Sequence, residues 1–208
     1  MLEGTFLAKR LRMLQHAAFL TGVLMNLWFR LLFLLISTPF RPRLAPPYGI
    51  SRLNFRVWFN DLDTNGHVNN GRYWTLFDLG RTDIMLRMGL LGAVLKNKWT
   101  PIVGGGAIRF RRELRLFQAF VLETRLVAWT ENRVVFEQRI LSDGDVVATR
   151  ALVLAGLYDR KRRGFVPIDT IFGTVGVTGV QSPPIDAAVQ AMLDLDAAMK
   201  LNADQEAG

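Results

Sequence analysis

The sequence contains no cysteine and only two histidines among its 208 residues. Disulfides, thiolate metal sites and a cysteine nucleophile are therefore excluded, and so is a histidine-rich metal site. A phosphate loop of the GxxxxGK[ST] type is also absent, and Gly104-Gly105-Gly106 lacks the strand-to-helix context of a dinucleotide site. We therefore expect no metal and no cofactor.

No nucleic-acid-binding module is recognisable, although the net charge is +8. Residues 1–50 hold six Lys/Arg and one Glu, which gives a net charge of +5. Residues 51–208 hold 20 Lys/Arg and 17 Asp/Glu, which gives +3. The basic excess thus flanks one apolar segment. This pattern indicates a membrane as the partner rather than a nucleic acid.

The apolar segment is residues 17–36, AAFLTGVLMNLWFRLLFLLI. A helix of this length extends about 30 Å, enough to cross the hydrocarbon core, with Arg30 snorkelling to the interface. Arg12, Asn26 and Arg30 fall on one side of a helical wheel, which leaves open a helix lying in the membrane surface. We expect residues 1–44, which end in a proline-rich linker, to anchor the protein; a core or subunit-contact helix is the alternative.

The remainder of the chain is typical of one domain with a tail. Alternation over residues 53–59 predicts a half-buried strand, and an apolar stripe predicts one helix over residues 70–88. The stripe consists of Tyr73, Phe77, Ile84 and Met88. This order of elements predicts an α+β fold.

Further strands are predicted at residues 101–116, 119–129, 133–142 and 145–158. Asp143-Gly144 between the last two is a strong hairpin turn. A loop over residues 171–182 and an amphipathic helix over residues 184–200 follow. We therefore expect a main domain at 45–170 and a tail at 171–208.

The stretch from Asp61 to Tyr73, DLDTNGHVNNGRY, crowds polar side chains just before the long helix. Five lie within eight residues: Asp63, Asn65, His67, Asn69 and Asn70. A helix start offers unpaired N–H groups and the positive end of a dipole, so a carboxylate and an imidazole beside it suit attack on a carbonyl. Asn and Asp before a helix are usually caps or turn residues, and Asp61 is interpreted in this way, but a cap needs only one side chain.

This stretch resembles the signature of hotdog-fold thioesterases of the 4-hydroxybenzoyl-CoA thioesterase type and, more closely, that of plant acyl-carrier-protein thioesterases. A second block, FRRELRLF at residues 110–117, is similar to one in a mammalian member of the thioesterase superfamily, and its Arg-Arg-Glu core recurs in the plant enzymes. The resemblance implies a single hotdog domain, a curled antiparallel sheet around one long helix.

The resemblance also implies roles for the first block. Asp63 matches the acidic position and would act as nucleophile or as a base on water. Asn65 and His67 match a pair that orients the attacking group or the substrate carbonyl. The backbone N–H at Asn70 would polarise the carbonyl, with its side chain merely capping the helix, and Tyr73 is assigned to substrate binding.

Glu113 in the second block is the other candidate carboxylate. Alternation continued to residue 116 puts Glu113 and Arg111 on one face of the strand and Arg112 on the apolar face. Arg111 and Arg112 are assigned to substrate binding, where they would meet the phosphates of coenzyme A. The alternative is that Glu113 merely pairs with a neighbouring arginine across a sheet. Leu114 stands where the plant enzymes can carry a cysteine, so a thiol mechanism is excluded.

We therefore predict a membrane-associated hydrolase of acyl-CoA or acyl-carrier-protein thioesters, with its catalytic domain in the cytoplasm. A homodimer or higher homo-oligomer is expected, because hotdog subunits usually pair their sheets. A hotdog hydratase and a catalytically weak acyl-binding or scaffold protein are the alternatives. The acyl group itself is left open by the sequence.

Overall fold

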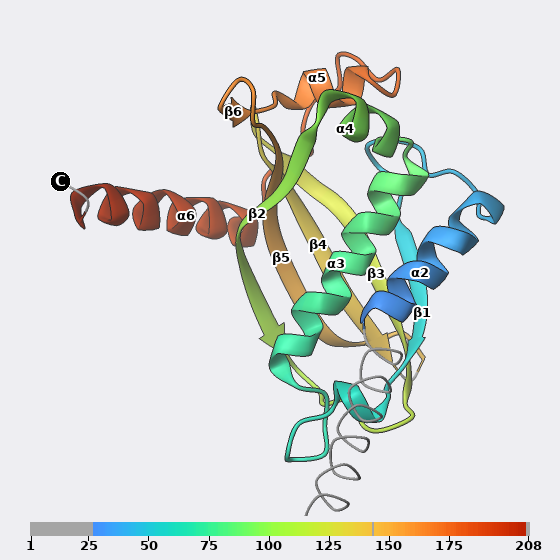
Figure 1. Cartoon of the computed structure of the whole chain (residues 1–208). Coiled ribbons are helices and arrows are strands. Elements are labelled where there is room, and N and C mark those ends of the chain that lie inside the picture. Colours follow the sequence, from blue (N-terminus) through green and yellow to red (C-terminus); the bar gives the residue numbers. More distant parts are fainter. Residues whose placement is uncertain (1–26, 143, 207–208) are drawn as a thin grey trace, which may run out of the picture.

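The computed structural model describes residues 27–142 and 144–206. Within them six strands form one antiparallel sheet in the order β1-β3-β4-β5-β2, with β6 beside β5. The strands are β1 (Ser51–Arg56), β2 (Trp99–Phe110), β3 (Ala119–Trp129), β4 (Val134–Ser142), β5 (Val146–Asp159) and β6 (Gly164–Phe165). Figure 1 shows this sheet curling around the long helix α3 (Asn70–Arg87). The predicted sheet-and-helix arrangement is confirmed.

Other elements surround this centre. They are α2 (Leu27–Ser37), η1 (Thr38–Phe40), η2 (Phe59–Asp61), α4 (Leu91–Asn97), α5 (Ile168–Gly173) and α6 (Ala187–Glu206). The start of α6 packs Val189 and Met192 on the sheet face opposite α3, and the rest of the helix projects beyond the edge strand β2 (Figure 1). The predicted tail helix is therefore present, although it begins at residue 187 rather than 184.

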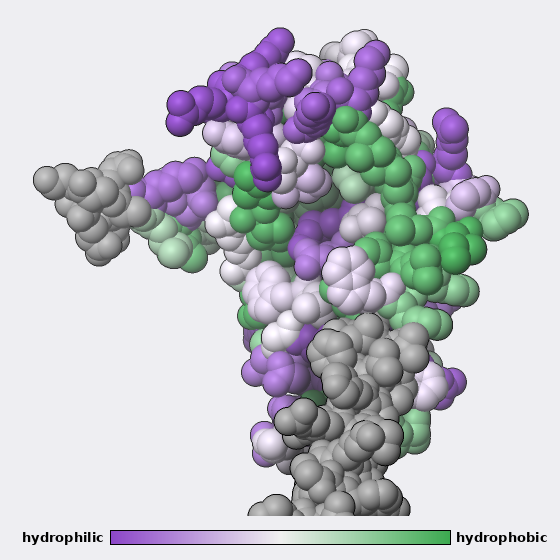
Figure 2. Space-filling view, viewed as in Figure 1, coloured by the Kyte–Doolittle hydropathy of each residue, from purple (hydrophilic) through white to green (hydrophobic). Residues whose placement is uncertain are grey.

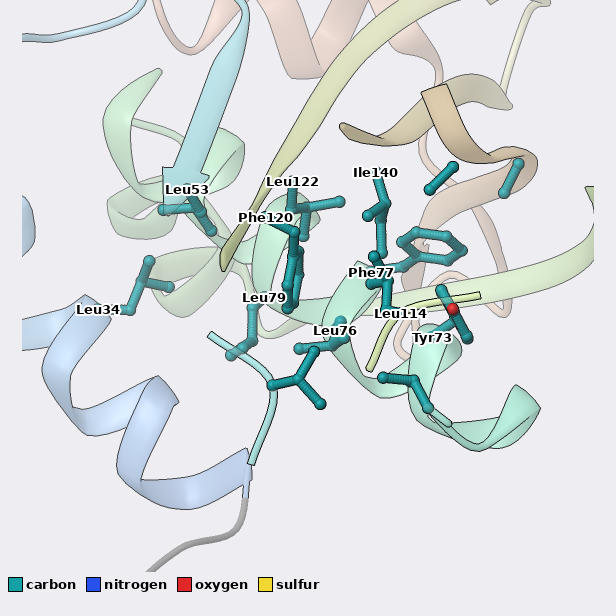
Figure 3. Packing of buried hydrophobic residues seen from close by; sticks show 14 residues of the cluster. Leu34, Leu53, Tyr73, Leu76, Phe77, Leu79, Leu114, Phe120, Leu122 and Ile140 are labelled. Atoms are coloured by element: carbon teal, nitrogen blue, oxygen red, sulfur yellow. The ribbon is translucent and has the colours of Figure 1, made fainter. Parts of the chain in front are cut away.

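The predicted apolar stripe of α3 is buried in the core. Tyr73 and Phe77 belong to the same buried cluster as the sheet residues Leu122 and Ile140 (Figure 3), whereas Ile84 lies in a second cluster near α5. The helix lies close to the sheet because position 80 is a glycine: a Cβ there would collide with Thr124 Oγ1.

The N-terminal helix α2 is docked on the body of the protein. Leu34 is buried in the same cluster as Leu53 and Leu79 (Figure 3). Arg30 points inward and its Nη2 lies 2.6 Å from Asp61 Oδ2, so the expected snorkelling of Arg30 is wrong. Residues 1–26, which include the first half of the predicted apolar run, lie outside the described residues. Within the described part of the chain, no helix has the length and apolar character needed to span a membrane.

The proline-rich linker is fixed to the far end of α3. Arg41 Nη1 lies 2.5 Å from Asp83 Oδ1, and Arg87 Nε donates to the carbonyl of Pro42 at 2.9 Å. Asp83 also accepts from Arg87 Nη1 at 3.1 Å and from Ser51 Oγ at 2.6 Å. The linker is therefore held at the end of α3 remote from the polar cluster.

The strand predicted over residues 101–116 is too long. β2 ends at Phe110, after which the N–H groups of Arg111 and Arg112 both donate to the carbonyl of Ala148, at 2.8 and 3.1 Å. Strand alternation therefore stops at residue 110, and Arg112 is exposed rather than on an apolar face. The first strand likewise ends at Arg56 instead of residue 59, since Phe59 enters the turn η2.

Candidate functional site

The polar cluster forms a tight turn between η2 and α3. Asp63 N–H donates to the carbonyl of His67 at 2.9 Å, and Gly66 N–H donates to the carbonyl of Asp63 at 3.2 Å. Leu62 and Val68 form a bridge just outside these bonds. Gly66 has a φ of +80°, a conformation that glycine adopts without strain. We call residues 62–68 the acidic turn.

The turn brings two of the predicted site residues together. Asp63 Oδ2 lies 3.3 Å from His67 Nδ1, and the side chains are 20% and 33% exposed. Asp63 Oδ1 accepts the N–H of Asn65 at 2.8 Å. Asn65 is exposed at the tip of the turn, so its backbone rather than its amide contacts the carboxylate. The carboxylate is thus oriented and still accessible from solvent.

The helix α3 begins directly after this turn. Asn69 is its cap: Asn69 Oδ1 accepts from Gly71 N–H at 2.8 Å, and the Asn69 carbonyl accepts from Arg72 N–H at 2.9 Å. The capping side chain is therefore that of Asn69, and the expectation that Asn70 caps is wrong. Asn70 is the first helical residue, and its N–H is among the four that a helix leaves without an internal acceptor.

The second sequence block lies beside the first. Val68 N–H donates to the carbonyl of Leu114 at 3.0 Å, and His67 forms a bridge with Arg115. Glu113 accepts from Arg115 Nε at 2.8 Å and from Arg115 Nη2 at 2.5 Å, and it is 48% exposed. The structure thus joins the two blocks through their backbones. The carboxylate of Glu113 pairs with an arginine, as the alternative predicted, but with Arg115 of its own segment and not across a sheet.

The arginines assigned to substrate binding lie on the surface next to this junction. Arg111 and Arg112 are both exposed, and they stand two or three residues before the Leu114 carbonyl that holds the turn. Tyr73, in contrast, is only 2% exposed and packs edge-on against Phe110 with ring centres 5.0 Å apart. Burial raises the pKa of Tyr73, which therefore stays protonated. Its position in the core makes it a support for the site.

Asp61 has more partners than a turn or cap residue needs. Its Oδ2 accepts the N–H of Trp58 at 2.9 Å, which confirms the cap, but the carboxylate also binds Arg30 and Arg72. The Arg30 contact could not be predicted from the local pattern, because Arg30 and Asp61 lie 31 residues apart in the chain.

An apolar cavity of about 300 Å³ lies between the second half of α3 and the sheet. Its lining includes Ile84, Met85, Met88, Phe136, Ala155 and Phe172. Asp78 and Arg81 form an ion pair at its edge, and burial lowers the pKa of Arg81 although the charge of Asp78 opposes this. This cavity was not predicted from the sequence, where its only local signal is the pair Met85 and Met88 at the end of α3.

Among residues 27–142 and 144–206, no group of three or more acidic or histidine side chains is placed to bind a metal ion.

These features correspond to those of a known family. The model of the thioesterase-like superfamily matches residues 57–193. The chain belongs to this superfamily. Residues 57–193 contain the acidic turn, α3 and the cavity-lining strands, so the whole candidate site lies within the matched region.

Comparisons with individual members agree with this assignment. The chain is 41% identical over 90 residues to protein THEM6 of Danio rerio, which covers 43% of this chain and 45% of that protein. Protein THEM6 of Xenopus laevis is 34% identical over 94 residues, which is 45% of each chain. The chain thus matches less than half the length of these relatives.

Solved structures show the same fold. A probable thioesterase of Escherichia coli, YbaW, superposes with a TM-score of 0.56 at 19% identity, covering 60% of this chain and 94% of that one. A DHNA-CoA thioesterase of Staphylococcus aureus gives a TM-score of 0.54 at 16% identity, covering 60% and 85%. The protein therefore has the hotdog fold of the thioesterases.

Proposed function

We propose that this protein hydrolyses an acyl-CoA or acyl-carrier-protein thioester, with Asp63 as the catalytic carboxylate. The observation that carries the proposal is the Asp63–His67 pair, held 3.3 Å apart beside the first N–H groups of α3 in a member of the thioesterase-like superfamily. The names of the related structures, which include thioesterases of aromatic acyl-CoA, support thioester chemistry.

In the proposed reaction Asp63 acts as a general base on water. Asp63 removes a proton as the water oxygen attacks the thioester carbonyl carbon. The Asn70 N–H stabilises the oxyanion, the C–S bond then breaks, and the departing thiolate takes the proton from Asp63. Since Asn65 N–H and His67 already engage the two oxygens of Asp63, the carboxylate is better placed to hold a water than to attack the carbon itself.

The apolar cavity is the proposed site for the acyl chain. Asp78, at the cavity edge, lies eight residues along α3 from Asn70, which is about 12 Å. An acyl group attached at the start of α3 therefore reaches the cavity only if it is long. The lining is mostly apolar, so a long aliphatic chain fits it better than a short or charged acyl group.

The coenzyme A part of the thioester would lie over the second sequence block, residues 110–117. Arg111 and Arg112 are exposed beside the acidic turn, and guanidinium groups bind phosphates in a bidentate manner. Arg115 is partly neutralised by Glu113. Coenzyme A, which carries its phosphates at the end remote from the sulfur, is the thioester carrier that this arrangement suits.

We also propose a homodimer formed through β2. This strand of 12 residues is at the edge of the sheet, and positions along it such as Val103, Ala107 and Phe110 are exposed. A long, exposed edge strand is a template for pairing with another strand. Pairing of two copies would place the junction beside Phe110, which contacts Tyr73 under the start of α3.

The face of α2 that turns away from the body is proposed to dock on a membrane surface. Figure 2 shows strongly hydrophobic surface over α2, on the right of the view. Large exposed side chains on α2 and η1 form this patch: Trp28, Phe29, Leu32, Phe33, Ile36 and Phe40, with exposures of 52–87%. Patches of this kind on a monomer mark interaction sites.

A lipid surface is the partner that fits this patch. The sequence before α2, residues 17–25, is apolar, and Lys9, Arg10 and Arg43 flank the apolar run. Aromatic and aliphatic side chains with a basic border favour an anionic membrane. Because Arg30 and Leu34 bind the body, we propose that α2 lies in the interface. The cytoplasmic side is proposed because coenzyme A thioesters are made and used inside the cell.

The test is release of thiol from acyl-CoA substrates of increasing chain length by the purified full chain. The proposal expects thiol release that rises with chain length. A hydratase would instead consume an enoyl thioester without releasing thiol.

A further inference from the structure

Asp61 is the most heavily bonded carboxylate near the acidic turn. It is 1% exposed and accepts from Arg30 Nη2 at 2.6 Å, Arg72 Nε at 2.7 Å and Trp58 N–H at 2.9 Å. A buried carboxylate is stabilised only by such charged and polar partners. These three partners belong to α2, α3 and the start of η2, so one side chain joins three segments.

The backbone of Asp61 holds the turn as well. Its carbonyl accepts the N–H of Asn69 at 2.8 Å, which closes the loop just outside the Leu62–Val68 bridge. Asp63 lies only two residues further along the chain. The position of Asp61 therefore sets both ends of the acidic turn, and with them the geometry of Asp63, His67 and the cap residue Asn69.

The bond between Asp61 and Arg30 links the acidic turn to α2. Arg30 also donates to the carbonyl of Arg56 at 3.1 Å and lies over the ring of Phe55, 5.5 Å from its centre. Arg30 thus occupies the inner face of α2, and the exposed aromatic patch occupies the other face. A partner that holds the outer face of α2 would therefore hold Arg30 in its contact with Asp61.

We propose that Asp61 is a positioning residue through which docking of α2 on a lipid surface orders the acidic turn and activates it. The inference rests on the proposed function for its catalytic consequence, but the ordering of the turn is independent of any reaction. A long-chain acyl thioester partitions into the same surface, so activity would rise where the substrate is concentrated.

Arg30→Gln is the informative variant, because Asp61 itself is buried and its replacement risks unfolding. The matched control is Arg41→Gln, which removes another arginine–aspartate pair between the N-terminal segment and α3, at the end of α3 remote from the turn. Arg30→Lys keeps the charge and should restore part of the effect. The full chain is studied with phosphatidylcholine vesicles, with and without phosphatidylserine.

The first readout is amide hydrogen exchange over residues 62–69. Vesicles should slow exchange there in the wild-type chain and in Arg41→Gln, but not in Arg30→Gln, although Arg30→Gln still binds the vesicles. Wild-type exchange behaviour in Arg30→Gln, or a wild-type chain that does not bind vesicles, would overturn the inference.

The second readout is the steady-state rate of thiol release. Arg30→Gln should lower kcat about 10- to 100-fold with little change in KM, since displacement of a catalytic group by about 1 Å has effects of this size. An equal loss in Arg41→Gln would mean general destabilisation and would contradict the inference. A wild-type chain that releases no thiol but shows the exchange pattern would refute the proposed function and support the coupling.

Discussion

Nδ1 of His67 lies 3.3 Å from Oδ2 of Asp63, across a turn closed by the backbone bond between the same two residues. The imidazole is therefore placed to hold the carboxylate in one orientation. We expect His67→Gln to lower kcat about 10- to 100-fold, below the full effect of a lost general base. The measurement is the steady-state rate of thiol release.

Glu113→Gln is the matched comparison for His67→Gln. Glu113 is half exposed and paired with Arg115, and exposed ion pairs contribute about 0–1 kcal/mol. Its loss should leave turnover close to wild type and change the free energy of unfolding by less than about 1 kcal/mol. A larger loss of turnover in Glu113→Gln than in His67→Gln would make Glu113 the leading candidate for the catalytic carboxylate.

Met85→Trp should shorten the acyl chains that the protein accepts. Met85 lines the cavity, and an indole there fills part of the 300 Å³. Each methylene excluded from an apolar pocket costs about 1–3 kcal/mol, so kcat/KM for long chains should fall at least tenfold while short chains are unaffected. Leu95→Trp, on the exposed face of α4, is the control. Equal losses for all chain lengths would place the acyl chain elsewhere.

Trp28→Ser with Phe33→Ser should weaken binding to vesicles. The two side chains are 68% and 72% exposed, and burial of one large apolar side chain contributes about 1.5–3 kcal/mol. Affinity should therefore fall at least tenfold in co-sedimentation, with thermal stability unchanged. Leu195→Ser, at an exposed apolar site on α6, should bind like wild type. Undiminished binding by the double variant would exclude α2 as the docking surface.

Ala107→Lys should convert the proposed dimer to a monomer. A charge in the middle of the exposed edge strand β2 opposes pairing with a second copy. Asn54→Lys, on the opposite edge strand β1, should remain dimeric. Sedimentation velocity distinguishes the two species. A wild-type chain that is monomeric at micromolar concentration would contradict dimerisation altogether.

The long helix and the acidic turn were predictable because their signals are local. The stripe of Tyr73, Phe77, Ile84 and Met88 follows the helical period, and Asp63 and His67 share one turn. The end of β2 was missed because the apolar-polar alternation resumes at Leu114 and Leu116. Arg112 therefore looked like a single charged exception on the apolar face, although the backbone turns toward Ala148 at this point.

Contacts between distant segments were also missed. In the sequence, Arg30 interrupts an apolar run. Only the folded chain shows that Arg30 forms an ion pair with Asp61. The cavity was missed for the same reason. Its walls come from α3, α5 and three or more strands, which lie far apart in the sequence.

The most direct measurement is thiol release from a long-chain acyl-CoA by the wild-type chain and by Asp63→Asn. The Asp63→Asn chain should be folded by circular dichroism and at least a hundredfold slower, because positioned acid–base groups contribute about 10²–10⁴-fold. Asp169→Asn, which changes an exposed carboxylate on α5, should match wild type. A folded Asp63→Asn chain with near-normal turnover would contradict the assignment of Asp63, and a wild-type chain without turnover would leave an acyl-binding protein in place of an enzyme.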